Sequence, residues 1–98
     1  MKHKIFSIHD SAAGAYLAPF FLHAEGIAIR TFTDCINDPE HAFGRHPKDY
    51  NLMVLGEFDD NNGEITIYQT QKPLGNGLSF VQQSEDTDQL QLLEAVQK

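Results

Sequence analysis

Residues 50–69 read YNLMVLGEFDDNNGEITIYQ, and this stretch decides more of the fold than any other. Apolar side chains dominate from Leu52 to Phe58, and after a polar break Ile65 and Ile67 alternate with polar neighbours. The break contains Asn62-Gly63, a pair favoured in tight hairpins because both residue types tolerate positive φ. The stretch therefore predicts two antiparallel strands, from about residue 50 to 58 and from about 64 to 69.

Two further regular elements precede the hairpin. Residues 3–9 read HKIFSIH, a short run rich in β-favouring residues with partial alternation, which predicts a strand. Between residues 26 and 37, apolar residues recur at spacings of three and four and predict a helix with one buried face, made of Ala28, Ile29, Phe32, Cys35 and Ile36. Asn37-Asp38-Pro39 should end that helix, since proline disfavours helix in the residue before it.

The remaining segments are less regular. Asp10 and Ser11 could cap a helix through residues 12–17, which Pro19 would kink or stop. Residues 41–49 predict a loop, and residues 72–77 a turn. Leu78, Phe80 and Val81 could add a short strand or plug the core. A last helix is expected from Ser84, with its apolar residues on one side: Leu90, Leu93 and Val96.

The sequence thus predicts an α+β fold in which a small antiparallel sheet packs on two helices. The expected order is β-α-α-β-β, with room for a further short strand and then a C-terminal helix or tail. A chain of 98 residues has length for one core only. We expect an α+β domain over residues 1–82, followed by an acidic helix or flexible tail over residues 83–98.

Charge and cysteine content restrict the function classes. Seven Lys and Arg residues face fourteen Asp and Glu residues, giving a formal net charge of −7 that opposes unspecific binding to phosphate backbones. The single Cys35 cannot form an internal disulfide, which fits a reducing compartment. No signal peptide or run of roughly 20 apolar residues is present, so the protein should stay where it is made.

Catalytic and metal sites are not predicted. The five histidines, at positions 3, 9, 23, 41 and 46, lack the paired spacing of zinc ligands. Residues 59–63 lack the ligand positions of a calcium loop. Cys35 lies on the apolar face of the predicted helix, as a small buried hydrophobe would. We therefore expect no enzyme activity, no cofactor and no bound metal.

The candidate contact residues are the cations that precede the acidic tail, which are Lys2, Lys4, Arg30, Arg45, Lys48 and Lys72. For Arg30, an ion pair with Asp34 on the same helix is favoured over a phosphate or partner contact. Phe43, Tyr50 and Tyr68 could stack on single-stranded bases, but core packing is favoured for each of them.

Several of these segments together match one pattern. They are residues 4–10, Pro19-Phe20-Phe21, residues 28–34 running into Asn37-Asp38-Pro39, Tyr50, residues 56–59, Gly63 and residues 74–77. Over residues 2–80 the chain resembles the small nonstructural protein of gokushovirus-type Microviridae, which are bacteriophages with circular single-stranded DNA. Members of that family are commonly described as DNA-binding proteins. That family usually carries an aromatic residue where this chain has His9.

The resemblance implies a nonstructural phage protein in the host bacterial cytoplasm, assisting viral single-stranded DNA synthesis or the switch from replication to packaging. It brings no catalytic residues. Since cations are few, we expect contact with viral or host replication or packaging proteins, through a sheet edge or helix face of a homo-oligomer. The alternative is a weak single-stranded DNA-binding protein that uses a local patch of basic and aromatic residues.

Overall fold

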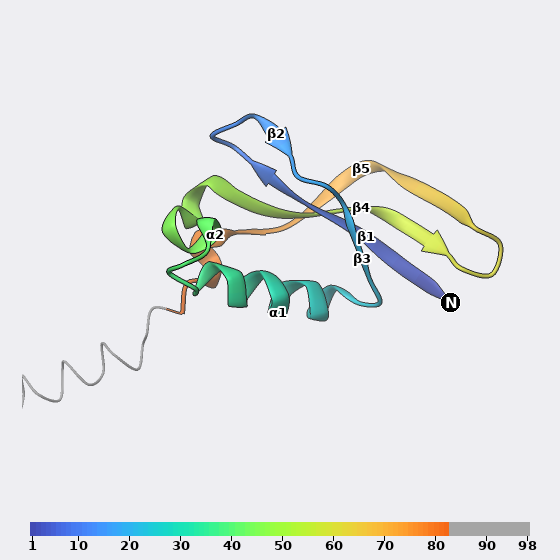
Figure 1. The fold of residues 1–98 in the computed structure, drawn as a ribbon. Coiled ribbons are helices and arrows are strands. Elements are labelled where there is room, and N and C mark those ends of the chain that lie inside the picture. Colours follow the sequence, from blue (N-terminus) through green and yellow to red (C-terminus); the bar gives the residue numbers. More distant parts are fainter. Residues whose placement is uncertain (83–98) are drawn as a thin grey trace, which may run out of the picture.

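The computed structural model describes residues 1–82 and shows an α+β domain with one curled antiparallel sheet (Figure 1). The strands are β1 (Lys2–Asp10), β2 (Ala15–Tyr16), β3 (Phe20–Leu22), β4 (Tyr50–Asp59) and β5 (Glu64–Asn76). The helices are α1 (Glu25–Ile36) and α2 (Ala42–Arg45), and two 3-10 turns follow as η1 (Pro47–Asp49) and η2 (Gly77–Phe80). Over the described residues no helix is long and apolar enough to cross a membrane.

The sheet has β1 at its centre. The strand order is β2-β1-β4-β5, and β3 also pairs with β1, all antiparallel. The predicted first strand and the predicted hairpin are confirmed as β1 and as β4 with β5. The hairpin loop spans residues 60–63 and ends on Gly63, whose φ of 76° glycine adopts at little cost because it has no Cβ.

Strand β5 runs further than the sequence indicated. The turn predicted for residues 72–77 is wrong, because the strand continues through Pro73 to Asn76. Residues 68–71 bulge opposite the single residue Leu55, pairing resumes with Val54 opposite Lys72, and a second, smaller shift leaves Leu74 without a partner on β4. β5 is an edge strand, the kind of strand to which proline in a sheet is confined, because a nitrogen on its outer side has no ladder partner to lose.

The core lies between the sheet and α1, as predicted for this helix, although Ile29 and Cys35 of the expected buried face are only partly buried. Three α1 residues are buried, Ala28, Phe32 and Ile36, and they pack against buried side chains of the two central strands: Phe6, Ile8, Leu52 and Val54. The helix ends at Asn37, whose side-chain amide donates to the Thr33 carbonyl. The same side chain binds the Phe80 carbonyl and the Gln82 N–H, which fixes η2 against the helix.

The helix predicted after Asp10 is wrong. The Asp10 carboxylate accepts hydrogen bonds from the N–H groups of Ala12 and Ala13, but they close a tight turn rather than start a helix. Gly14, at φ 66°, reverses the chain into β2. Leu17 then donates its N–H to the Ile8 carbonyl, so this segment extends the sheet. The second helix of the fold is instead the short α2.

Two other segments also differ from their predictions. The loop predicted for residues 41–49 contains α2 and η1, and the His41 side chain caps α2 by accepting from the Phe43 N–H. The segment around Phe80 plugs the core through η2 rather than adding a strand, with its ring 5.7 Å from that of Phe32. The predicted last helix and the boundary with residues 83–98 lie outside the described residues.

Candidate interaction site

The two faces of the sheet have different surroundings. Successive side chains of a strand point to opposite faces, so Phe6 and Ile8 point toward α1 while His3 and Ile5 point away from it. The strand registers carry this second face across four strands. Its members are His3, Ile5, Phe21, Gly56, Phe58, Ile65 and Ile67, and we call this surface the open face.

The open face consists of two aligned rows. One row runs Phe21, Ile5, Gly56 and Ile67 across β3, β1, β4 and β5, and the other runs His3, Phe58 and Ile65. Gly56 fits because the strands approach closely there: a Cβ atom would lie 2.1 Å from the Thr66 carbonyl oxygen. Because Gly56 has no side chain, the surface is recessed at this position of the first row.

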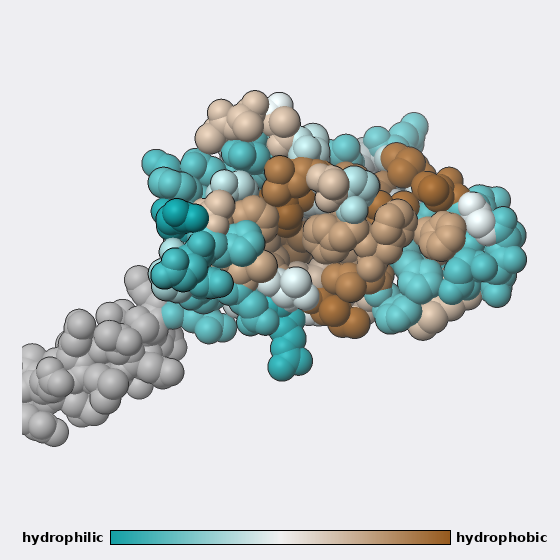
Figure 2. Space-filling view, in the orientation of Figure 1, coloured by the Kyte–Doolittle hydropathy of each residue, from teal (hydrophilic) through white to brown (hydrophobic). Residues whose placement is uncertain are grey.

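An apolar hollow lies on this face. It has a volume of about 520 Å³ and is lined by His3, Phe21, Phe58 and Ile65. The rings of Phe21 and Phe58 meet edge to face, with centroids 5.9 Å apart. Phe21 is 46 % exposed, Ile65 55 % and Ile67 61 %, so large apolar side chains stand in water around the hollow. In Figure 2, brown and tan surface covers the middle of the molecule and reaches along β5, while teal surface covers the hairpin loop.

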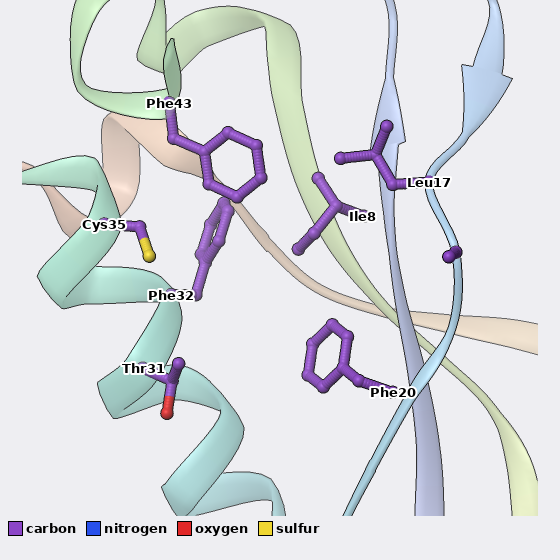
Figure 3. A pocket seen from close by; sticks show the side chains of 8 residues that line it. Ile8, Leu17, Phe20, Thr31, Phe32, Cys35 and Phe43 are labelled. Carbon is purple, nitrogen blue, oxygen red and sulfur yellow. The ribbon is translucent and has the colours of Figure 1, made fainter. Parts of the chain in front are cut away.

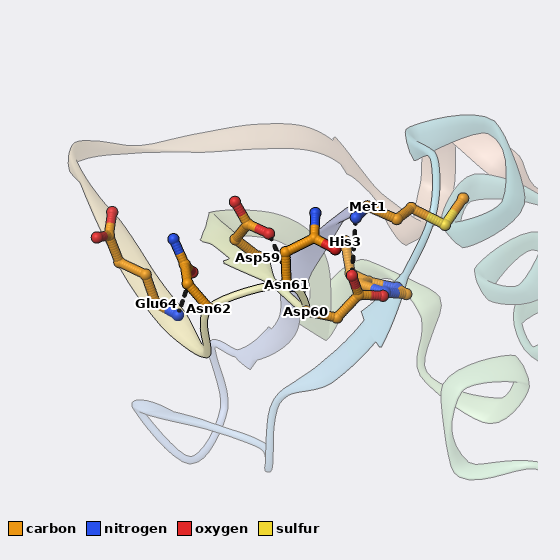
Figure 4. Close-up of polar contacts among 7 residues, drawn as sticks. All are labelled: Met1, His3, Asp59, Asp60, Asn61, Asn62 and Glu64. Atoms are coloured by element: carbon orange, nitrogen blue, oxygen red, sulfur yellow. Dashed lines mark hydrogen bonds and ion pairs between the residues drawn. The ribbon is translucent and has the colours of Figure 1, made fainter.

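A charged network joins His3 of the open face to the N-terminus and the hairpin loop (Figure 4). The Asp60 carboxylate lies 2.7 Å from the N-terminal ammonium group and 2.8 Å from His3 Nε2. These hydrogen bonds, from the ammonium group first and His3 second, hold the pKa of the Asp60 carboxyl below its ordinary value. The hollow is therefore lined by apolar side chains and by His3, whose ring binds the ionised carboxylate of Asp60.

A second apolar crevice lies on the other side of the sheet, between the strands and α1 (Figure 3). It has a volume of about 250 Å³, and Phe20, Phe32 and Phe43 form much of its wall. Cys35 also lines it, and burial, followed by the charges of Asp34 and Asp38, raises the pKa of this thiol. A raised pKa makes the thiol a poor nucleophile at neutral pH.

The six candidate cations do not form one patch. Lys4 and Lys72 meet at Glu25, with Nζ atoms 3.9 and 3.1 Å from its carboxylate. Lys2 lies in a small crevice with the carboxylates of Glu57, Asp59 and Glu64. These three lysines belong to the strands, and each has acidic neighbours that offset its charge.

The other three cations lie on the helical side. Arg45 on α2 donates to the Glu40 carbonyl, and Lys48 lies exposed on η1. Arg30 is exposed on α1, and within residues 1–82 no ion pair joins it to Asp34. Figure 1 shows α2 at one end of α1 and the hairpin beyond the other end, so the cations are distributed along the molecule.

The aromatic residues considered for base stacking belong to the core. Phe43, Tyr50 and Tyr68 are partly buried and pack against the central cluster, as favoured from the sequence. The rings of Phe43 and Tyr50 lie 4.4 Å apart. Among residues 1–82, no group of three or more His, Cys, Asp or Glu side chains could hold a metal ion.

Sequence reasoning did not identify the open face. From the sequence, Ile65 and Ile67 indicate only an alternating strand. The structure pairs them with Phe58 and Gly56, so that the four positions share one face. Which face of the sheet α1 covers depends on tertiary packing, and the short β3, which contributes Phe21, was not predicted as a strand. The sequence alone does not give the pairing between strands, so it could not show that these residues share one face.

The comparisons with known proteins give one match. A family model described as Phage ORF5 protein matches residues 3–80, which include nearly all of the described fold. No curated protein and no solved structure matches the chain.

Proposed function

Since the chain belongs to the Phage ORF5 protein family, we propose that it is a phage accessory protein that acts by protein–protein contact through the open face. Its partners are viral or host proteins of replication or packaging in the bacterial cytoplasm. Its role is to assist viral single-stranded DNA synthesis or the switch from replication to packaging. The resemblance to the nonstructural protein of gokushovirus-type Microviridae supports this finer assignment.

The observation that carries the proposal is the exposure of large apolar side chains around the hollow. Phe21, Ile65 and Ile67 are each between 46 % and 61 % exposed and lie on one face with Phe58. Contiguous exposed apolar surface of this kind marks interaction sites, because removing it from water is favourable. Aromatic side chains in pockets also supply much of the binding energy at protein interfaces.

The hollow indicates what the partner presents. Its lining is apolar, and its volume of about 520 Å³ accommodates an aromatic or large aliphatic side chain. The exposed Asp60 carboxylate, bound to His3 beside the hollow, can accept a further hydrogen bond from a partner N–H or lysine. We infer that the partner inserts an apolar anchor flanked by a donor.

The alternative, weak binding of single-stranded DNA, has less support from the geometry. A phosphate that contacts Lys4 or Lys72 must compete with the Glu25 carboxylate, and Lys2 lies among three acidic residues. The net charge of −7 adds a general repulsion. If DNA binding is the function, purified protein shifts single-stranded DNA at low salt and loses affinity steeply as salt rises.

The test replaces Phe21 by serine in the phage that encodes the protein. The matched control is Ile27→Ser on α1, because the two side chains have nearly equal exposure, 46 % and 44 %. We expect Phe21→Ser to lower the accumulation of viral single-stranded DNA relative to duplex DNA in infected cells, measured by quantitative hybridisation. The control should behave as wild type, and thermal melting should show that both variants fold.

A photo-crosslinking residue at position 21 then identifies the partner by mass spectrometry. A crosslink to a replication or packaging protein supports the proposal. Wild-type DNA accumulation with Phe21→Ser, in a folded protein, refutes docking on the open face.

A further inference from the structure

The outer edge of β5 is unpaired in the described part of the chain. The sheet order ends with β5, which pairs with β4 alone. Residues 64–67 pair regularly with β4, and Figure 1 shows this end of the hairpin extending beyond α1. An exposed strand edge presents N–H and C=O groups that can pair with another strand.

The direction of these groups follows from one close approach. The Thr66 carbonyl oxygen lies 2.1 Å from the position a Cβ on Gly56 would take, so this carbonyl faces β4. Successive residues of a strand direct their backbone groups to opposite edges. The N–H and C=O groups of Ile65 and Ile67 therefore point outward.

We propose that two copies of the chain pair through the β5 edges, antiparallel, with a two-fold axis at Thr66. In this register Ile65 of each copy faces Ile67 of the other. Each of these pairs exchanges two backbone hydrogen bonds, because the outward groups belong to the same residues. Thr66 faces its own counterpart in a pair without hydrogen bonds, and Glu64 faces Tyr68.

The edge sequence is self-complementary, which favours a second copy as the occupant. Ile65-Thr66-Ile67 reads the same in both directions, as a two-fold contact requires. Cross-strand partners share a face, so the four isoleucines gather on one side of the joint sheet. Ile65 and Ile67 are 55 % and 61 % exposed in one copy, and part of that area becomes buried.

The register also separates like charges. The two Glu64 residues lie four positions apart along the paired strands, which is about 14 Å at 3.4 Å per residue. The open faces of the two copies join into one continuous surface and stay uncovered. The dimer therefore does not depend on the proposed docking function, and its short edge contact makes it reversible.

A register-specific disulfide tests the proposal. Thr66→Cys is made in a Cys35→Ser background, so that it is the only thiol in the chain. Antiparallel pairs without hydrogen bonds have Cα atoms about 4.5 Å apart, which a disulfide can span. We expect mild oxidation of the purified protein to link it into dimers, at least about tenfold more than the matched Glu64→Cys variant, whose thiols are too far apart.

Adding Ile67→Lys to the Thr66→Cys protein should abolish the crosslink, whereas Ile27→Lys, at an exposed position on α1, should not. Circular dichroism checks that each variant folds. Equal yields from the Thr66→Cys and Glu64→Cys proteins, or none from either, would overturn the dimer. A strand of another protein would then be the remaining candidate for this edge. The Phe21 experiment would be unaffected, so the two proposals can fail separately.

Discussion

Replacing Phe32 by alanine should remove the centre of the contact between α1 and the sheet. Phe32 is 3 % exposed, and its ring lies 5.8 Å from that of Phe43 and 5.7 Å from that of Phe80. Truncating a buried phenylalanine costs about 3–5 kcal/mol. Phe32 also lines the open crevice beside α1, where water can enter the space left behind. We therefore expect a loss near the lower end, about 3 kcal/mol.

That loss is a large part of the 5–15 kcal/mol by which domains are stable. It should lower the melting temperature by about 12–24 °C for a domain of this size. Urea unfolding followed by circular dichroism measures the free energy, and Ile27→Ala on the same helix serves as the control. Ile27 is 44 % exposed, so its truncation should change stability by less than about 1 kcal/mol. Equal losses in the two variants would refute the assignment of the buried face of α1.

Three other perturbations have defined outcomes. Gly56→Ala should destabilise the domain by about 1–3 kcal/mol in urea unfolding. The added Cβ would meet the Thr66 carbonyl, and only a shift of β5 relieves the overlap. Wild-type stability would contradict the close approach of the two strands. In the folded protein at pH 8, Cys35 should react with iodoacetamide several-fold more slowly than in the urea-unfolded chain, because burial raises the pKa of its thiol. Equal rates would show that the thiol is accessible and its pKa is not raised. Asp60, whose pKa lies below its ordinary 3.8 in the folded state, should stabilise the domain fully above that pH and lose this effect as the pH falls further. Asp60→Asn should therefore lower stability at pH 6 but not at pH 2, and an equal loss at both would contradict the hydrogen bonds from His3 and the N-terminus.

Local sequence patterns predicted the elements in which several independent signals favour the same structure. The β4–β5 hairpin combines alternation with a glycine-containing loop, and α1 combines a 3.6-residue apolar period with a proline stop, so both were predicted correctly. The segment after Asp10 shows why local signals can mislead. An aspartate that accepts from the next N–H groups serves a turn as well as a helix, and here pairing with β1 decided between them.

The candidate site was less accessible to sequence reasoning than the fold. The six cations were identified individually, but their carboxylate neighbours come from distant parts of the chain, as Glu25 does for Lys72. The open face needs the register of four strands, including β3, whose three residues carry too little pattern to be recognised. The composition establishes that acidic residues outnumber basic ones, and in the structure the lysines of the strands do have acidic neighbours.

The fastening of η2 by Asn37 has a practical consequence for labelling the protein. Its side-chain amide binds both the Phe80 carbonyl and the Gln82 N–H, so residues 80–82 are held at a fixed point at the end of α1. Figure 1 places that point at the opposite end of the molecule from the β4–β5 loop. A fluorescent or affinity fusion attached after residue 82 would thus leave the hairpin accessible, whereas one joined to Met1 would remove the ammonium group that Asp60 binds.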